Sequence, residues 1–270
     1  MDIIANGVRL QYIESGTGYP VVCLHGNGLN RDLWRHFIPE LSKRYRAIAY
    51  ELRGMGKSEA PGRPEVTHTI EDHAKDFEGF LEGLGVDRAA IVGHAFGGFV
   101  AMRVAIDRPE LVSAIVLVNS TAKSPSGGDA PGWARTAESE GMEPLLDNQM
   151  SRWFLERLHR DQPEVIQFYR EMLGANPPMG YAANSRGVAL MDLRSELNAI
   201  KCPTILIGGK EDKSIPLSVN KQNAEQIPGA QLALINDASH VVPEEQPVEF
   251  NRTALEFLDQ NIPRGLIQSQ

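Results

Sequence analysis

Residues 90–100 read AIVGHAFGGFV, an apolar run followed by a glycine-rich turn and a second apolar segment. This order predicts a buried strand, a sharp turn and the first turn of a helix. The stretch matches the G-x-S-x-G nucleophile elbow except at the central serine, which is replaced by Ala95. Glycines two residues before and after that position keep the strand and the helix apart at such a strained turn. We therefore expect an active site at Ala95, with the nucleophile missing.

Strands and helices alternate along most of the chain. Apolar runs at residues 21–24, 46–50, 89–92, 113–118 and 204–207 predict strands that are covered on both faces, as in parallel sheets. Helices are predicted over residues 32–43, 70–84, 96–107, 218–226 and 247–259. This alternation predicts an α/β fold with a doubly wound, mostly parallel sheet.

The alternation stops between residues 120 and 195. Residues 124–132 have the composition of a loop, and the segment that follows, up to about residue 190, is amphipathic and helical. We interpret residues 120–195 as a helical cap inserted between two strands of the sheet. Residues 1–119 and 196–270 then form the core domain.

Two further polar residues follow predicted strands. Asp212 comes shortly after the strand at 204–207, and His240 follows a strand near 231–235. Ligands collect at the carboxyl ends of the strands of an open parallel sheet, so we expect Asp212 and His240 to lie beside Ala95. Their chain order is nucleophile, acid, histidine, which is the order of the α/β-hydrolases among serine hydrolases.

With these motifs, nearly the whole chain resembles the α/β-hydrolase superfamily. The loop His25-Gly26-Asn27-Gly28 looks like the oxyanion loop of that family. Residues 51–58 (ELRGMGKS) are similar to its D-x-R-G-x-G-x-S turn, with Glu51 in place of Asp. Parts of the cap look like those of 3-oxoadipate enol-lactonases and related lactonases and carboxylesterases: residues 140–146, 152–154, 180–182 and 192–194.

The resemblance implies a role for each site residue. A serine at the position of Ala95 would attack an acyl carbon, and His240 would take and return its proton. Asp212 would hold the His240 ring in the useful tautomer. The backbone N–H groups of Asn27 and Phe96 would receive the developing oxyanion.

A cap closes over a ligand, so residues in and near it are candidates for the substrate pocket. The pocket candidates are His94, Trp133, Met150, Trp153, Phe154 and Val241. No metal-ligand spacing is found among the histidines, and the Gly54-x-Gly56 turn lacks the third glycine of a dinucleotide-binding loop. We expect neither a metal nor a cofactor, and a small-molecule ester or lactone as the substrate.

Three explanations of Ala95 stay open. In the first, the chain is an inactivated serine-to-alanine form of an ester or lactone hydrolase. In the second, Ala95 is native, and the protein either activates water through His240 and Asp212 or only binds a small ligand. In the third, the lost nucleophile is an aspartate, as in haloalkane dehalogenases and epoxide hydrolases. The intact oxyanion loop, acid and histidine favour the first explanation.

Composition excludes several other functions. Of the 270 residues, 42% are hydrophobic and 23% are charged, which is typical of a globular protein. The net charge of −8 disfavours nucleic acid and anionic membranes as partners. Neither a signal peptide nor a membrane-spanning run is recognised, so we expect a cytoplasmic protein. Cys23 and Cys202 are expected to be buried free thiols, and a homodimer stays open.

Overall fold

One eight-stranded sheet forms the centre of the computed structural model, which describes residues 1–262 but not the side chains of residues 126 and 127. The strand order is β1-β2-β4-β3-β5-β6-β7-β8. β2 pairs antiparallel with β1 and β4, and every other neighbouring pair is parallel, so the predicted sheet is confirmed. The strands are β1 Asp2–Ala5, β2 Val8–Ser15, β3 Pro20–Leu24, β4 Arg46–Tyr50, β5 Ala89–His94, β6 Val112–Val118, β7 Thr204–Gly209 and β8 Gln231–Ile235.

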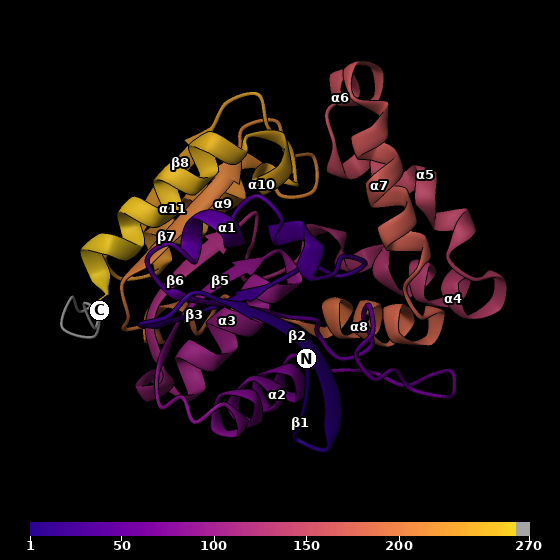
Figure 1. The fold of residues 1–270 in the computed structure, drawn as a ribbon. Coiled ribbons are helices and arrows are strands. Elements are labelled where there is room, and N and C mark those ends of the chain that lie inside the picture. Colours follow the sequence, from indigo (N-terminus) through magenta and orange to yellow (C-terminus); the bar gives the residue numbers. More distant parts are fainter. Residues whose placement is uncertain (263–270) are drawn as a thin grey trace.

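Helices cover both faces of this sheet, with α2 and α3 on one face and α1 and α11 on the other (Figure 1). Every residue of β5 and β6 is therefore buried, which explains their continuous apolar sequences. Outside the segment between β6 and β7, the helices are α1 Ile38–Leu41, α2 Ile70–Gly83, α3 Phe96–Asp107, α9 Leu217–Gln226, α10 Val242–Glu245 and α11 Pro247–Asn261.

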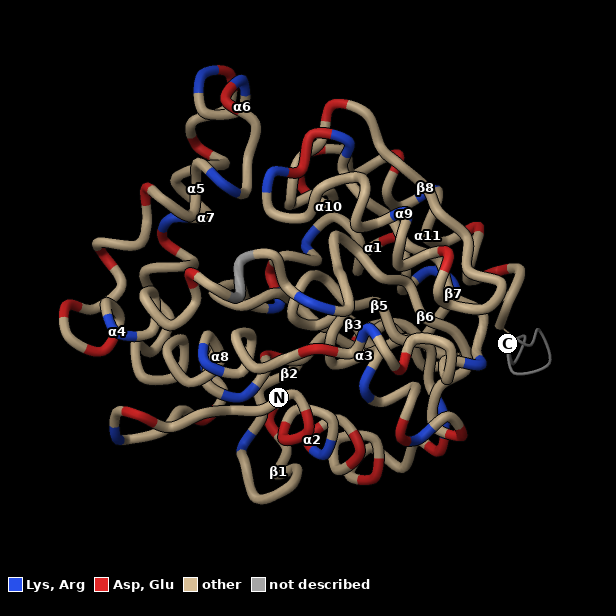
Figure 2. The backbone as a smooth tube through the Cα atoms, turned by 180° about the vertical axis from the view of Figure 1, so that it is seen from behind, with Lys and Arg blue, Asp and Glu red and all other residues tan. Residues whose placement is uncertain are grey.

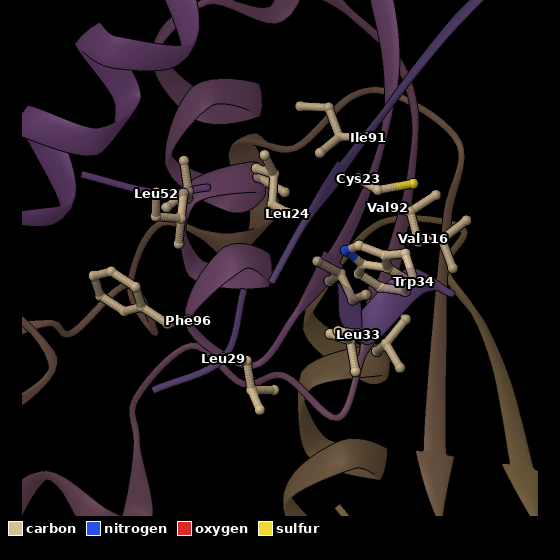
Figure 3. Packing of buried hydrophobic residues seen from close by; sticks show 14 of the residues in the cluster. Cys23, Leu24, Leu29, Leu33, Trp34, Leu52, Ile91, Val92, Phe96 and Val116 are labelled. Atoms are coloured by element: carbon tan, nitrogen blue, oxygen red, sulfur yellow. The ribbon is translucent and has the colours of Figure 1, made fainter. Parts of the chain in front are cut away.

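The packing around β3 is shown in Figure 3. Cys23 pairs in register with Val92 of β5, and Figure 3 draws both in one buried cluster with Val116 of β6 and Trp34. Both cysteines are free, as the sequence predicts; Cys23 is fully buried, whereas Cys202 is only half-buried. Cys23 therefore packs as a small apolar side chain in the centre of the sheet.

One predicted helix is wrong. Residues 32–43 do not form a continuous helix but a 3-10 turn at Arg31–Trp34 and the single turn of α1. Pro39 would lie in the middle of the longer helix, where it has no N–H to donate and collides with the preceding turn. The interruption lets Trp34 and Phe37 pack on Phe250 of α11, with ring centroids 6.2 and 5.1 Å away.

Five helices form between β6 and β7, and we call this segment the helical insert. Its helices are α4 Ala130–Glu140, α5 Leu146–Trp153, α6 Glu156–Asp161, α7 Pro163–Gly174 and α8 Pro178–Leu190. Helices α5 to α7 project away from the sheet, whereas α8 lies close to it (Figure 1). Figure 2 shows Lys and Arg interspersed with Asp and Glu over the core and the insert.

Helix α8 approaches the core backbone closely. A Cβ added to Gly180 would lie 2.6 Å from the Cα and carbonyl carbon of Gly54, so a side chain there does not fit. Asn184, one turn later, accepts hydrogen bonds from His68 and His73 and donates one to the carbonyl of Arg53. Helix α8 thereby fixes one end of the insert to the core. Among residues 1–262, no helix has the length and apolar character needed to span a membrane.

Candidate active site

The turn at Ala95 has the strained geometry of the predicted elbow. Strand β5 ends at His94, α3 begins at Phe96, and Ala95 between them has φ 46° and ψ −109°. A positive φ is unusual for a residue with a Cβ and is maintained only by its surroundings. A Cβ added to Gly93 would lie 2.5 Å from the carbonyl oxygen of Gly97, so the strand and the helix can meet only through glycine. The chain therefore keeps the full elbow although its apex carries a methyl group.

Asp212 lies next to His240, as the chain order predicts. Its Oδ2 accepts hydrogen bonds from His240 Nδ1 at 2.9 Å and from Asn119 Nδ2 at 2.7 Å. Its Oδ1 accepts the backbone N–H groups of Ser214 at 2.7 Å and Ile215 at 3.1 Å. Burial alone would raise the pKa of Asp212, but the charge and hydrogen bond of His240 and the donated hydrogen bonds outweigh it and lower the pKa. Asp212 is therefore ionised and fully hydrogen-bonded.

The hydrogen bond to Asp212 fixes the orientation of the His240 ring. Nδ1 carries the proton that it donates to Asp212, which leaves Nε2 to accept a proton. His240 lines the same cavity as Ala95. In this arrangement His240 can act as a general base toward a group bound at the elbow.

Two other histidines near the elbow have structural roles. His94 Nε2 donates to the backbone carbonyl of His240 at 2.8 Å, and burial, helped by the charge of His240, lowers the pKa of His94 to about 3. His25 Nε2 accepts the N–H of Leu52 at 3.0 Å, and burial lowers its pKa to about 4. Both rings are neutral and shape the loops around them.

A cavity lies over Ala95 and joins the elbow to the helical insert. Ala95, Phe96, His240 and Asn27 line it from the core. Two pocket candidates, Trp133 of α4 and Trp153 of α5, line it from the insert. Further residues that the sequence did not indicate line it from the core and from the insert. These further residues are Phe99, Ser124, Ala130, Gln149, Arg152, Tyr181, Val188, Ser214 and Ile215.

Four other pocket candidates are not among the described residues that line this cavity, and each packs behind its wall. Phe154 packs edge-on against Tyr169 of α7, with ring centroids 4.9 Å apart. Met150 is 1% exposed and lies beside Gln149 on α5 but on a different face of that helix. His94 supports the backbone of His240, and Val241 is fully buried. In an amphipathic helix, apolar residues fill the core more often than a cavity.

Arg152 and Gln149 are the two polar wall residues on α5 that sequence reasoning missed. They lie on α5 with Trp153, and the spacing of 149, 152 and 153 puts them on one face of a helix. The Arg152 guanidinium is 5.1 Å from the centroid of Trp133, and it is 3.8 Å from the carboxylate of Asp129. Gln149 is 2% exposed, and its Nε2 has no hydrogen-bond partner among the described residues. The sequence signal that could have identified them is their spacing, which puts both polar side chains on the same helix face as Trp153.

The two predicted oxyanion residues both line the cavity beside Ala95. Phe96 is the first residue of α3, where backbone N–H groups have no partner within the helix and the helix dipole is positive. The side chain of Asn27 is held from the insert, because its Nδ2 donates to Ser185 Oγ of α8 at 2.9 Å. The arrangement can receive a carbonyl oxygen next to the elbow. Residues 1–262 contain no cluster of three His, Cys, Asp or Glu side chains placed to hold a metal.

Comparisons with known proteins agree with this geometry. Residues 19–247 match the family model of the alpha/beta hydrolase fold. The chain is 31% identical to a 2-hydroxymuconate semialdehyde hydrolase of Pseudomonas sp. strain CF600, covering 95% of this chain and 93% of that one. It is 28% identical to 3-oxoadipate enol-lactonase 2 of Acinetobacter baylyi, covering 92% of each.

A solved structure extends the likeness to three dimensions. The enol-lactonase of Burkholderia xenovorans LB400 is 30% identical and superimposes with a TM-score of 0.92 over 96% of this chain and 100% of that one. These relatives are hydrolases, which supports a hydrolytic function. By its fold, its elbow and its family match, the chain belongs to the α/β-hydrolase family.

Proposed function

We propose that this site hydrolyses carboxylic esters, and lactones in particular, in the form of the chain that carries serine at position 95. The observation that carries the proposal is the His240–Asp212 pair, which lines the same cavity as the strained apex of the elbow. An apex that no longer carries a nucleophile has little structural reason to retain a positive φ. In this proposal the present chain is a serine-to-alanine variant whose remaining machinery is intact.

The reaction would proceed through an acyl-enzyme. The hydroxyl oxygen at position 95 attacks the acyl carbon while His240 Nε2 takes its proton, and Asp212 stabilises the imidazolium. The N–H groups of Phe96 and Asn27 receive the oxyanion, and each such donor contributes about 3 kcal/mol to the transition state. His240 then returns the proton to the leaving alkoxide, which in a lactone stays attached to the acyl group. Finally, water deprotonated by His240 hydrolyses the acyl-enzyme.

The cavity wall supports a small substrate with one polar end. Phe99, Val188 and Ile215 provide apolar contacts, whereas Gln149 and Arg152 bring donors from α5. Donors of this kind suit a carboxylate or a carbonyl oxygen. The relatives named as enol-lactonases support a lactone as the substrate. Residues 120–195 would serve as the cap that supplies this wall.

The test compares the A95S variant with the unaltered chain on a p-nitrophenyl ester and on a panel of lactones that includes enol-lactones and acyl-homoserine lactones. Loss of the serine costs about six orders of magnitude in a comparable hydrolase, so we expect A95S to gain at least about 10⁴-fold. The double variant A95S H240A should lose that gain.

An A95S variant as inert as the unaltered chain would contradict the proposal. In that case, hydrolysis by the unaltered chain that depends on His240 would indicate water activation. Stabilisation by a ligand without turnover would indicate a binding protein. Gain of dehalogenase or epoxide hydrolase activity in A95D would point to a lost aspartate.

A further inference from the structure

We propose that Glu245 is a positioning residue that ties the α5–α6 turn of the helical insert to the loop carrying His240. The role of His240 itself rests on the proposed function, but the physical tie does not. The carboxylate of Glu245 bridges two segments: its Oε2 accepts the N–H of Ser239 at 2.7 Å, and its Oε1 accepts the N–H of Leu155 at 3.2 Å. One side chain thus holds both the residue before His240 and the end of the cavity wall.

The backbone of His240 lies between these two contacts. Its N–H donates to the carbonyl of Trp153 at 3.0 Å, and its own carbonyl accepts the His94 ring at 2.8 Å. The side chain of Trp153 lines the cavity. The residue whose indole lines the cavity therefore also holds His240 through its backbone carbonyl. Movement of the α5–α6 turn would displace the His240 ring relative to the elbow.

Glu244, the neighbouring residue, makes a different kind of contact. Its carboxylate pairs with the guanidinium of Arg35 and accepts the Tyr169 hydroxyl of α7 at 3.2 Å. The contact with Arg35 is an ion pair within the core, and only the hydrogen bond from Tyr169 links Glu244 to α7. Glu245 makes no ion pair within 4 Å among the described residues, so its two acceptor bonds to backbone N–H groups define its role.

The protonation of Glu245 governs how many of these bonds it can make. Burial raises its pKa to about 7, although the N–H groups of Leu155 and Ser239 oppose the shift. Of the charged groups around it, Asp212 raises the pKa further and Arg157 of α6 lowers it. The ionised carboxylate accepts both N–H groups, whereas the protonated form points an O–H at one of them. The tie is therefore complete above pH 7 and weakened below it.

The other titratable groups near Glu245 do not account for a change of its hydrogen bonds near pH 7. Tyr169 of α7 faces Glu245 and Glu244, and burial with these charges raises the pKa of its hydroxyl well above the usual range. Tyr169 therefore stays neutral across the range in which Glu245 titrates. His240 donates its Nδ1 proton to Asp212, and it is linked to Glu245 through the backbone of Ser239, whose N–H donates to the Glu245 carboxylate.

The first test measures amide exchange in the unaltered chain, in E245Q, in E245L and in the exposed control E225Q. A carboxamide keeps one acceptor oxygen, so E245Q should accelerate exchange about tenfold at Leu155 or Ser239 and also at His240. E245L should accelerate both. The amide of Val116 in β6 should keep its rate in every variant. Below pH 7 the unaltered chain should approach E245Q.

Unchanged exchange in folded E245Q and E245L would overturn the proposal. Equal acceleration at Val116 would overturn it too, since that pattern indicates global destabilisation. In the A95S background, E245Q should lower kcat about tenfold and leave KM within about twofold, whereas E225Q should change neither. Because the exchange measurement needs no turnover, an inert A95S would contradict the proposed function and leave the tie tested separately.

Discussion

The two regions that meet over Ala95 hold their polar groups in different ways. On the core side, the Asp212 carboxylate receives four hydrogen bonds, and His240 is held by its ring and by its backbone. On the insert side, Gln149 has a buried donor with no partner among residues 1–262. A buried unpaired donor costs about 1–3 kcal/mol. The Asp212–His240 pair is therefore organised before a ligand binds, whereas Gln149 keeps a buried donor that an acceptor on a ligand would satisfy.

The difference teaches which region controls chemistry and which controls recognition. Groups that are already paired stabilise a transition state without reorganising. Unpaired groups discriminate between ligands, since an analogue without the matching acceptor leaves the donor buried and unsatisfied. Substitutions in the core should change the rate most, and substitutions on α5 should change the choice of ligand.

The largest effect is expected from a substitution that disrupts the Asp212–His240 pair of the core. In the A95S background, D212N keeps the shape of the acid but holds His240 in the wrong tautomer, so kcat should fall about 10⁴-fold. Ester hydrolysis followed at several substrate concentrations measures kcat and KM separately. The exposed substitution D237N serves as a control. A loss of less than about tenfold would mean that Asp212 does not orient the histidine.

The next largest effect is expected from a substitution that disrupts the contact between α8 of the insert and the core. G180A places a methyl group against the backbone of Gly54, so the free energy of unfolding should fall by about 2–3 kcal/mol. G174A is the matched control on α7, where an added Cβ meets side-chain carbons of Leu146 at ordinary contact distance. Denaturant unfolding measures both. Equal stability of the two variants would show that α8 does not need the close approach.

A third prediction concerns the pH dependence of stability. Glu245 has a folded pKa of about 7 against about 4.5 when unfolded, so the folded state holds its proton over that window. Stability should therefore fall as the pH rises from about 4.5 to 7, by about 1–3 kcal/mol. Denaturant unfolding at pH 5 and pH 8 should show a smaller fall in E245Q than in the unaltered chain. Parallel curves for the two proteins would contradict this prediction.

The smallest effect is expected from a substitution on α5 of the insert, which tests whether Gln149 recognises the ligand. Q149L removes a buried unpaired donor, so the ligand-free protein should become slightly more stable, while binding of a dicarboxylate such as glutarate should weaken about tenfold. Calorimetry on the unaltered chain and on Q149L measures both changes. Q167L on the outside of α7 is the control, because Gln167 bonds only Glu171 among the described residues. A loss of stability together with unchanged binding would remove Gln149 from the recognition site.

The sequence by itself predicted the sheet, the elbow and the chain order of Ala95, Asp212 and His240. These are local properties, because alternating apolar runs predict strands and because Gly93 and Gly97 are required wherever a strand and a helix meet so closely. The restriction that Pro39 places on a helix is also local, but the prediction of a helix over residues 32–43 did not take it into account. Trp133 and Trp153 were found in the cavity wall because large residues of a helical insert face either its core or the ligand.

Tertiary structure alone decided which insert residues reach the cavity and what holds His240 in place. Gln149, Arg152 and Met150 are near neighbours on one short helix, and only the packing of α5 on the core separates cavity from interior. The bonds of Glu245 join residues 90 positions apart in the chain. Spacing along a chain fixes which residues share a helix face, but the direction of that face is set by the partner on which the helix packs.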